Sequence, residues 1–544
     1  MKRLLHKKIL IPVFLLSVFF TGTAFKSNFF EVAKQIEIFT TLFKELNMNY
    51  VDETNPGDLM NTAIKSMLSD LDPYTNFMNE QDVEAARINN TGDYTGIGAS
   101  VLTQKDKLVI VEPYKDYPAD KAGLRAGDEI IKVENVVVAD FKDDAGNLLQ
   151  GAAGTAVNVT YVRQGRTQNT TIKREAVEIH AVPHFSMVDD KTGYVVLRKF
   201  NNKASAETIA AIRALKAEGA KKIILDLRGN PGGLLSEAVN VVNIFVPQNQ
   251  LVVTTKSKVK KYNKTYYTQK QPLDTEIPVV VLIDGRSASA SEIVSGALQD
   301  LDRAVVVGAR SFGKGLVQRP KQLIYGTQMK ITISRYYTPS GRCIQALDYW
   351  NRDENGKATR VKQENYNAFK TKKGRTVYDG GGIDPDLKMI ESEYSPITNA
   401  ILNDNLIFEY ATTYYYKNKV TTLEDFKLTD NDFKNFKSYL KTNNFNFETK
   451  TEKAFDNAIA VAKEEGLQNT INSDYNTLVD GLNRYKNQAI DDNKIQLLAL
   501  LSDEIVKRYF YREGLYTYYI AHNPEIQKAT EILKNPSTYL GYLN

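Results

Sequence analysis

The segment Asp284-Gly285-Arg286-Ser287-Ala288-Ser289-Ala290-Ser291-Glu292 constrains what the chain on either side of it can form. It follows the apolar run of residues 277–283, which is typical of a buried strand in a parallel sheet. Apolar residues then recur at the spacing of one helix face, from Ile293 to Leu301. The sequence therefore predicts a strand, a tight turn and a helix, with small hydroxyl residues at the helix N-terminus. Such a turn can expose a nucleophilic oxygen beside backbone N–H groups that stabilise an oxyanion.

Serines at a helix start also have a simpler explanation, because Ser289-x-x-Glu292 has the form of a capping box. A second segment, residues 308–318, adds a chemical reason: it holds Lys314 between two glycines and ends at Gln318. The chain has only four histidines, and a Ser–Lys pair needs none as its base. A lysine can act as base if burial keeps it neutral, and the amide oxygen of Gln318 can hold the amine. A solvated turn lysine and a polar strand residue remain the alternatives for these two positions.

The two segments together carry a family resemblance. Ser-Ala-Ser-Ala-Ser-Glu, followed by Phe-Gly-Lys-Gly-Leu-Val-Gln with the lysine 25 residues after the middle serine, resembles the carboxyl-terminal processing (tail-specific) proteases of peptidase family S41. The resemblance implies that Ser289 is the nucleophile, Lys314 the general base and Gln318 the residue that orients the lysine. The residues alone leave Ser287, Ser289 and Ser291 open, and the resemblance selects Ser289. It covers roughly residues 30–390.

The oxyanion hole is predicted by the same resemblance. A buried strand at residues 222–227 ends in Arg-Gly-Asn-Pro-Gly-Gly, a turn before a helix, where exposed N–H groups collect. The resemblance implies that the N–H of Gly232 or Gly233 acts with that of Ala290. A plain loop that requires positive φ is the alternative for the glycines. Asp300 matches an acidic position in the family and is expected to support the lysine segment, with an ordinary aspartate at a helix end as the alternative.

A glycine-rich region that precedes these turns carries a second resemblance. The segment Tyr94-Thr95-Gly96-Ile97-Gly98-Ala99 and the later Pro118-Ala119-Asp120-Lys121-Ala122-Gly123 resemble a PDZ domain. In that fold a Gly-apolar-Gly loop offers N–H groups to a C-terminal carboxylate, and the peptide adds to the sheet as a strand. The loop here would be Gly96, Ile97 and Gly98. A small β module with tight turns would explain the glycines alone.

Length and composition frame these assignments. A chain of 544 residues predicts two to four domains, and a net charge of +5 without a basic stripe gives no indication of nucleic-acid binding. We expect a multidomain α+β protein with an α/β Ser–Lys protease core, a PDZ-like β module and helical regions at both ends. The expected segments are 1–25 (signal peptide or membrane anchor), 28–90 (helical, with one helix capped by Asp58), 91–180 (PDZ), 181–390 (protease core) and 391–544 (helical).

The amino terminus predicts export. A basic start is followed by residues 9–25, which carry no charge and end in Thr-Gly-Thr-Ala-Phe. Cleavage after Ala24 and retention as an anchor are both compatible with this run, which is at the short end of a membrane span. We expect a periplasmic protein, or one on the periplasmic face of the inner membrane. The single cysteine, Cys343, allows no internal disulfide. A homo-oligomer is compatible with the C-terminal helices.

Two other enzyme classes fit poorly. Gly308-x-x-x-x-Gly313-Lys314 approaches a phosphate-binding P-loop, but a glycine stands where Mg²⁺ needs Ser or Thr, and Pro320 interrupts the required helix. No His-Glu-x-x-His zinc motif occurs, so we predict no metal and no cofactor. The predicted function is a serine endopeptidase that cleaves proteins near their free C-termini. The alternative is an inactive PDZ-bearing scaffold that binds peptides in the cell envelope.

Overall fold

The computed structural model describes residues 29–544 except 105, 142–143, 355 and 390–393. By its internal contacts the chain divides into a small unit, residues 1–78 with 320–331, and a large unit with the remainder. The predicted leader, residues 1–25, lies outside the described residues. Within those that are described, no helix has the length and apolarity needed to cross a bilayer.

The small unit is mainly helical. Its described part contains a helix over residues 29–49 and α2 (Pro56–Ser69), followed by β1 (Asn76–Met78), which pairs antiparallel with residues 328–330. The cap of α2 differs from the expectation. Asn55, not Asp58, takes the N–H groups of Gly57 and Asp58, because Pro56 can occupy the first helical position.

The protease core of the large unit is built on a six-stranded sheet in the order β10-β11-β12-β15-β16-β23. Its strands are β10 (His184–Asp189), β11 (Thr192–Val196), β12 (Lys222–Asp226), β15 (Val279–Ile283), β16 (Val305–Gly308) and β23 (Leu387–Lys388). Only the β10–β11 pair is antiparallel. The carboxyl ends of β12, β15 and β16 therefore meet at one edge of the sheet, where open α/β sheets bind their ligands.

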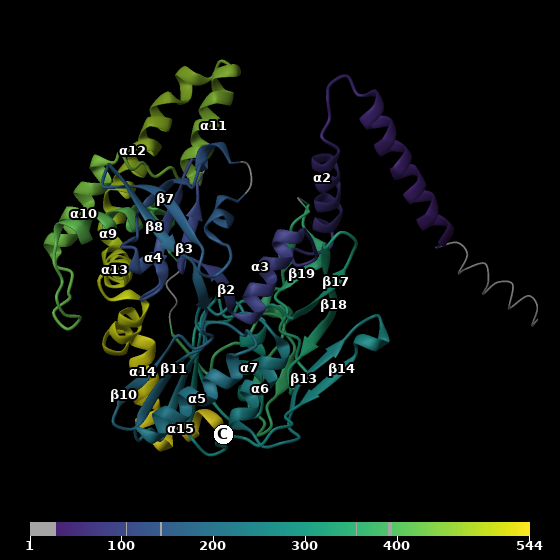
Figure 1. Ribbon diagram of the computed structural model, residues 1–544, viewed down its shortest axis with the longest axis vertical. Helices are drawn as coiled ribbons and strands as arrows, with labels where there is room; N and C mark the ends of the chain where they lie inside the picture. Colours follow the sequence, from purple (N-terminus) through teal and green to yellow (C-terminus); the bar gives the residue numbers. More distant parts are fainter. Residues whose placement is uncertain (1–28, 105, 142–143, 355, 390–393) are drawn as a thin grey trace, which may run out of the picture. The chain divides into compact units, whose positions relative to one another are not determined.

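Both faces of this sheet are covered by helices, as a parallel sheet requires. One face packs on α5 (Ala204–Ala217), α6 (Leu235–Phe245) and α7 (Ala290–Asp300). The other face, with Tyr194, Ile224, Val280 and Val305, packs on the C-terminal end of the chain, through α14 (Pro524–Lys534) and α15 (Pro536–Leu543). The last helices of the chain thus complete the protease core (Figure 1).

The PDZ-like module is a small antiparallel sheet. It runs in the order β3 (Ala99–Thr103), β4 (Leu108–Pro113), β5 (Glu129–Val133), β7 (Ala156–Arg163) and β8 (Arg166–Lys173), with β6 (Val136–Val137) paired to β5. The short helices α4 (Pro118–Lys121), η1 (Val138–Asp140) and η2 (Ala145–Leu149) lie between strands. Helix α3 (Glu80–Thr91) leads into β2 (Asp93–Gly96), which pairs with β9 (Glu175–Glu178). The module has its own apolar core, which includes Ile97, Leu108, Ile130 and Val157.

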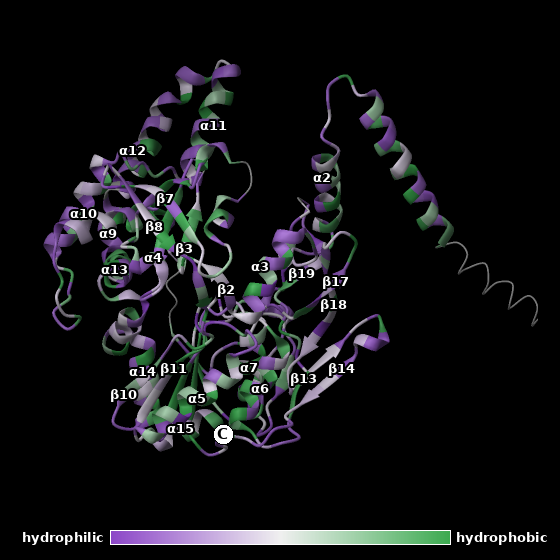
Figure 2. Cartoon of the chain, in the orientation of Figure 1, coloured by the Kyte–Doolittle hydropathy of each residue, from purple (hydrophilic) through white to green (hydrophobic). Residues whose placement is uncertain are grey.

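The C-terminal region consists mainly of helices, most of which share an apolar cluster of their own. They are α8 (Pro396–Asn403), α9 (Leu406–Lys417), α10 (Asp430–Thr442), α11 (Lys450–Glu464), α12 (Gln468–Asp492) and α13 (Lys494–His522). Phe436, Leu497 and Ile505 are among the buried residues of this cluster. Figure 2 shows how hydrophilic the outer helices are, with much purple on α10 and α12 and more green on the strands near β11.

The remaining strands surround the edge of the core. Strand β13 (Leu251–Lys256) pairs with β14 (Lys264–Tyr267) and, through residues 254–256, with residues 335–337 of β18 (Gln328–Tyr337). The charged stretch from Asp348 to Lys373 forms two small hairpins, β19 (Leu347–Arg352) with β20 (Ala358–Arg360) and β21 (Ala368–Lys370) with β22 (Thr376–Tyr378). The expected multidomain α+β fold with a PDZ module, an α/β protease core and C-terminal helices is confirmed.

Candidate active site

Three turns meet at the carboxyl edge of the sheet. The serine turn follows β15, the Arg228–Gly233 turn follows β12, and the lysine segment follows β16. Since β12, β15 and β16 are neighbours in the sheet, these turns lie side by side. The sequence predicted each turn separately, and the parallel pairing brings them together.

The serine turn distinguishes its three hydroxyls. Ser287 and Ser291 are fully buried, and their hydroxyls donate to the carbonyls of Leu227 (2.8 Å) and Asn230 (2.9 Å). Ser289 is partly exposed and has φ 55° and ψ −109°, a conformation that costs a non-glycine residue free energy. Ser287 and Ser291 therefore act as structural bridges to the neighbouring turn, and Ser289 is the partly exposed one of the three serines.

A single buried carboxylate joins the serine turn to the lysine segment. Glu292 Oε2 accepts the backbone N–H of Ser289 (2.7 Å) and that of Lys314 (3.0 Å). Its Oε1 accepts the N–H of Gly313 (2.7 Å) and the hydroxyl of Ser311 (2.6 Å). Ser289 and Lys314 are thus held within hydrogen-bond reach of one oxygen atom, although they come from different turns.

The role of Glu292 goes beyond the cap that the sequence indicated. The capping-box contact to Ser289 is present, but three further donors come from 19 to 22 residues away. Burial raises the pKa of Glu292, and the hydrogen bonds from Ser311 and from the three backbone N–H groups oppose that rise. Sequence periodicity gives no sign of such long-range donors. On its helix Glu292 shares a face with Ser295, Gly296 and Gln299, so the spacing gave no signal beyond the capping box.

The Arg228–Gly233 turn is fastened to the serine turn. Asn230 is completely buried; its side chain accepts the N–H of Gly232 (2.9 Å) and donates to Leu197, and its carbonyl accepts the N–H of Ala288 (3.0 Å). A β-carbon on Gly232 (φ 98°) would lie 2.9 Å from the nitrogen of Ala290, so the two backbones are in close contact. The N–H of Gly232 is therefore already used by Asn230, which leaves that of Gly233 as the candidate donor.

Two further predicted residues have contacts of their own. The side-chain nitrogen of Gln318 donates to Thr332 (3.2 Å), so its amide oxygen is the atom that can accept from an amine. Asp300 is buried and binds Arg342 (2.7 Å) and the N–H of Ser340 (3.0 Å). The carboxylate of Asp300 therefore holds the turn after β18, and its predicted support of the lysine segment stays a prediction.

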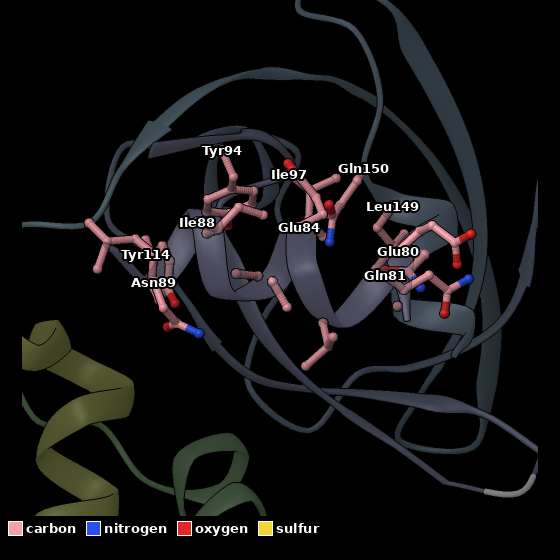
Figure 3. Close-up of a pocket in the computed structure, with 16 residues that line it drawn as sticks. Glu80, Gln81, Glu84, Ile88, Asn89, Tyr94, Ile97, Tyr114, Leu149 and Gln150 are labelled. Atoms are coloured by element: carbon pink, nitrogen blue, oxygen red, sulfur yellow. The ribbon is translucent and has the colours of Figure 1, made fainter. Parts of the chain in front are cut away.

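The predicted peptide loop borders a cavity of about 510 Å³. Ile97 lines it from the loop, Ala99 and Val101 line it from β3, and Leu149 lines it from η2. Helix α3, which the sequence placed in the N-terminal helical region, forms another wall, and Figure 3 shows its side chains, including Ile88 and Glu84, beside Ile97 and Tyr94. The cavity is large enough for several residues of an extended peptide.

The rejected alternatives can be examined in the structure. After Gly315 the chain forms strand β17 (Leu316–Gln322), whereas a P-loop needs a helix there to bind phosphate. Glu178, His180 and Glu207 lie close enough together at the surface to hold an ion. However, Lys203 pairs with Glu178 (2.6 Å) and the N–H of Val182 donates to Glu207 (2.8 Å), so we assign no ion to this cluster.

Comparison with known proteins supports the same domains. Family models match residues 191–349 (peptidase family S41), 95–173 (PDZ domain) and 397–533 (probable PDZ-protease, C-terminal helical domain). The carboxy-terminal-processing protease of Bartonella bacilliformis is 35% identical over 321 residues, which cover 58% of this chain and 73% of the relative. A probable CtpA-like serine protease of Staphylococcus aureus is 30% identical over 406 residues, 72% of this chain and 79% of the relative.

A solved structure also resembles the chain. The photosystem II D1 C-terminal processing protease is 27% identical, with a TM-score of 0.36, over 65% of this chain and 92% of that chain.

Proposed function

Because the chain belongs to the carboxy-terminal-processing proteases of peptidase family S41, we propose that it is a serine endopeptidase in which Lys314 activates Ser289. The observation that carries this proposal is the shared acceptor Glu292, which holds the backbones of Ser289 and Lys314 together. The strained backbone of Ser289 and the occupied hydroxyls of Ser287 and Ser291 support the choice of nucleophile.

The proposed reaction begins with neutral Lys314. Its amine takes the proton of the Ser289 hydroxyl as the oxygen attacks the scissile carbonyl, and the N–H groups of Gly233 and Ala290 stabilise the tetrahedral oxyanion. The lysine then gives its proton to the leaving amine. Water attacks the acyl-enzyme in the second half of the reaction, and Gln318 orients the lysine in both halves.

We further propose that the PDZ module holds the free C-terminus of the protein substrate. The N–H groups of the Gly96–Gly98 loop would take the carboxylate, and the cavity beside β3 would take the last side chains. From the uncharged run of residues 9–25 we also propose that the chain is exported, to the periplasm or to the outer face of the inner membrane.

The test uses one fluorogenic peptide with an apolar free C-terminus. The same peptide sequence is used for the parent and for every variant. Ser289→Ala is expected to abolish cleavage and to retain peptide binding, whereas Ser287→Ala and Ser291→Ala are the matched controls for nucleophile choice. Lys314→Arg should also be inactive, because a guanidinium keeps its proton at working pH. Activity retained in Lys314→Arg would refute the base assignment. Binding without any cleavage by the parent would favour an inactive scaffold.

A further inference from the structure

Helix α13 has a sharp break at Tyr511, where the backbone adopts φ 55° and ψ −167°. An aromatic residue with positive φ inside a helix is strained and persists only if its surroundings impose it. The contacts that impose it come from the PDZ module: the hydroxyl of Tyr511 donates to Asp120 (2.7 Å), and the guanidinium of Arg512 pairs with Glu112.

The break separates two halves of α13 with different neighbours. Before it, Leu497, Leu501 and Ile505 belong to the core of the C-terminal helices. After it, Leu515 still belongs to that core, whereas Tyr516 belongs to the apolar cluster on the second face of the protease sheet, with its ring centroid 5.3 Å from that of His184. The second half of α13 is therefore directed to the catalytic core and leads into α14.

The junction of α13 and α14 contacts Arg228, the first residue of the Arg228–Gly233 turn, which is called the oxyanion turn from here on. Arg228 Nη1 donates to the side-chain oxygen of Asn523 (2.9 Å) and to Glu525 (3.3 Å). The rest of the guanidinium binds Asp226 at two points, 3.0 and 2.6 Å, and Asp226 also accepts the hydroxyl of Tyr194 (2.6 Å). Arg228 is thus fixed between the end of β12 and the C-terminal helices.

The position of Arg228 matters because the turn that it begins carries the predicted oxyanion donor, Gly233. Between them, Gly229 donates to Asp284 (2.8 Å) and Asn230 is bound to the serine turn. A small displacement at Arg228 would move a turn that has little freedom elsewhere, and oxyanion stabilisation depends steeply on donor placement.

We propose that Asn523 and Glu525 are positioning residues of the protease, which hold Arg228 and through it the oxyanion turn. This inference rests on the proposed function. It gives the C-terminal helices a part in catalysis: they cover the second face of the sheet and also complete the support of the active site.

The test compares three variants of the full-length protein. Asn523→Ser with Glu525→Ala removes the two side-chain acceptors of Arg228 Nη1 and leaves the bonds to Asp226 in place. The serine can still cap α14, as Asn523 does in the parent by accepting the N–H of Ile526 (3.1 Å). Asn523→Asp with Glu525→Gln keeps an acceptor at both positions. Glu531→Ala is the matched control, because Glu531 lies on the same helix but pairs with Lys528 at the surface.

The first variant is expected to lower kcat about tenfold with KM changed less than twofold, a fraction of the loss caused by removing an oxyanion donor. The acceptor-keeping variant and Glu531→Ala should stay within about threefold of the parent, in line with their retained contacts. If these residues had only a structural role, the variant would have a lower melting temperature and a smaller active fraction. The kcat of its active molecules would not fall while KM stayed the same. An unchanged kcat in the first variant overturns the proposal. If that variant does not fold, the single change Glu525→Ala takes its place with the same criterion.

Amide hydrogen exchange separates this inference from the proposed function. Exchange of a peptide spanning residues 227–235 should quicken in the first variant and not in Glu531→Ala, whether or not a substrate is cleaved. If the parent cleaves no peptide, the proposed function fails, and the exchange measurement still decides whether Asn523 and Glu525 hold the turn. Unchanged exchange overturns the inference.

Discussion

The two glycine-containing loops that are proposed to donate backbone N–H groups, the Arg228–Gly233 turn and the Gly96–Gly98 loop, are held in different ways. The oxyanion turn is fixed by side chains: the buried Asn230 and Asp284 bind its backbone, and the partly buried Asn523 and Glu525 bind its first residue. The Gly96–Gly98 loop is held mainly by backbone bonds, from Ala119 to Ile97 (2.7 Å) and from Tyr114 to Gly98 (2.9 Å), and it borders an open cavity. A catalytic donor must be fixed in one place, whereas a binding loop must admit ligands of different shape.

The largest expected effect comes from adding one methyl group to the oxyanion turn. The β-carbon of Gly232→Ala would lie 2.7 Å from the carbonyl oxygen of Ala288 and 2.9 Å from the nitrogen of Ala290, at φ 98°. Because all these neighbours are backbone, the turn must shift, and kcat should fall about a hundredfold or more. Steady-state kinetics on the free-C-terminus peptide measures this. A variant with parental kcat would show that the turn tolerates movement.

Weakening the four hydrogen bonds that Glu292 accepts should have the second largest effect on kcat. In Glu292→Gln an NH₂ group replaces one oxygen and meets backbone N–H donors, so at least one buried bond is lost. We expect kcat to fall at least about tenfold and the free energy of unfolding to drop by about 1–3 kcal/mol. Glu237→Gln, at another buried glutamate of the core, serves as a control for the loss of a buried charge. Equal losses of kcat in the two variants would contradict a specific role for Glu292.

The same methyl group in the peptide loop should act on binding. In Gly98→Ala (φ 69°) the β-carbon would lie 2.4 Å from that of Tyr117, so the loop is displaced. Peptide affinity, measured by fluorescence anisotropy, should weaken about tenfold, the cost of about one hydrogen bond. The kcat at saturating peptide should stay near the parental value. Gly154→Ala, in an open turn of the same module, is the control. A fall in kcat equal to that of Gly232→Ala would erase the distinction between the loops.

Acid should lower the free energy of unfolding through His184 on β10, and this is the smallest of the expected effects. Burial lowers the pKa of His184 to about 4, while an unfolded histidine titrates near about 6.5. Between these values the unfolded chain binds a proton that the folded chain does not, so the free energy of unfolding decreases as pH falls. His184→Phe should remove about 1 kcal/mol of this loss at pH 5, after allowance for partial exposure. Chemical unfolding at pH 7.5 and pH 5 checks this, with the exposed His522→Gln as control.

Local pattern predicted much of the core. The helix predicted after the serine turn is α7 (Ala290–Asp300), and the apolar run at 277–283 contains β15 (Val279–Ile283). The three turns were found because each follows such a strand. Their adjacency depends on strand order, which the residues do not encode locally. The roles of Ser287, Ser291 and Glu292 depend on partners from 19 to 61 residues away, so the sequence indicated Glu292 only as a cap and left Ser287 and Ser291 open as nucleophiles.

The second layer of the sheet could not be foreseen. The valine-rich strands require cover on both faces, and one layer follows from the crossover helices. The other comes from residues 516–543, whose Tyr516, Ile526 and Tyr539 are ordinary members of an amphipathic pattern. Nothing in that pattern names its partner surface. For the same reason the contact of Asn523 with Arg228, across 295 positions, leaves no trace in the sequence.

The hydrogen bonds of Glu292 also affect whether a newly synthesised chain can cleave itself or other unfolded chains. One carboxylate on α7 binds the backbones of Ser289 and Lys314, the proposed catalytic pair, and it does so only when that helix is packed against its sheet. A partly folded chain should therefore be unable to cleave peptide bonds. We expect proteolytic activity to appear only at the last stage of folding, when few unfolded chains remain that could be cleaved.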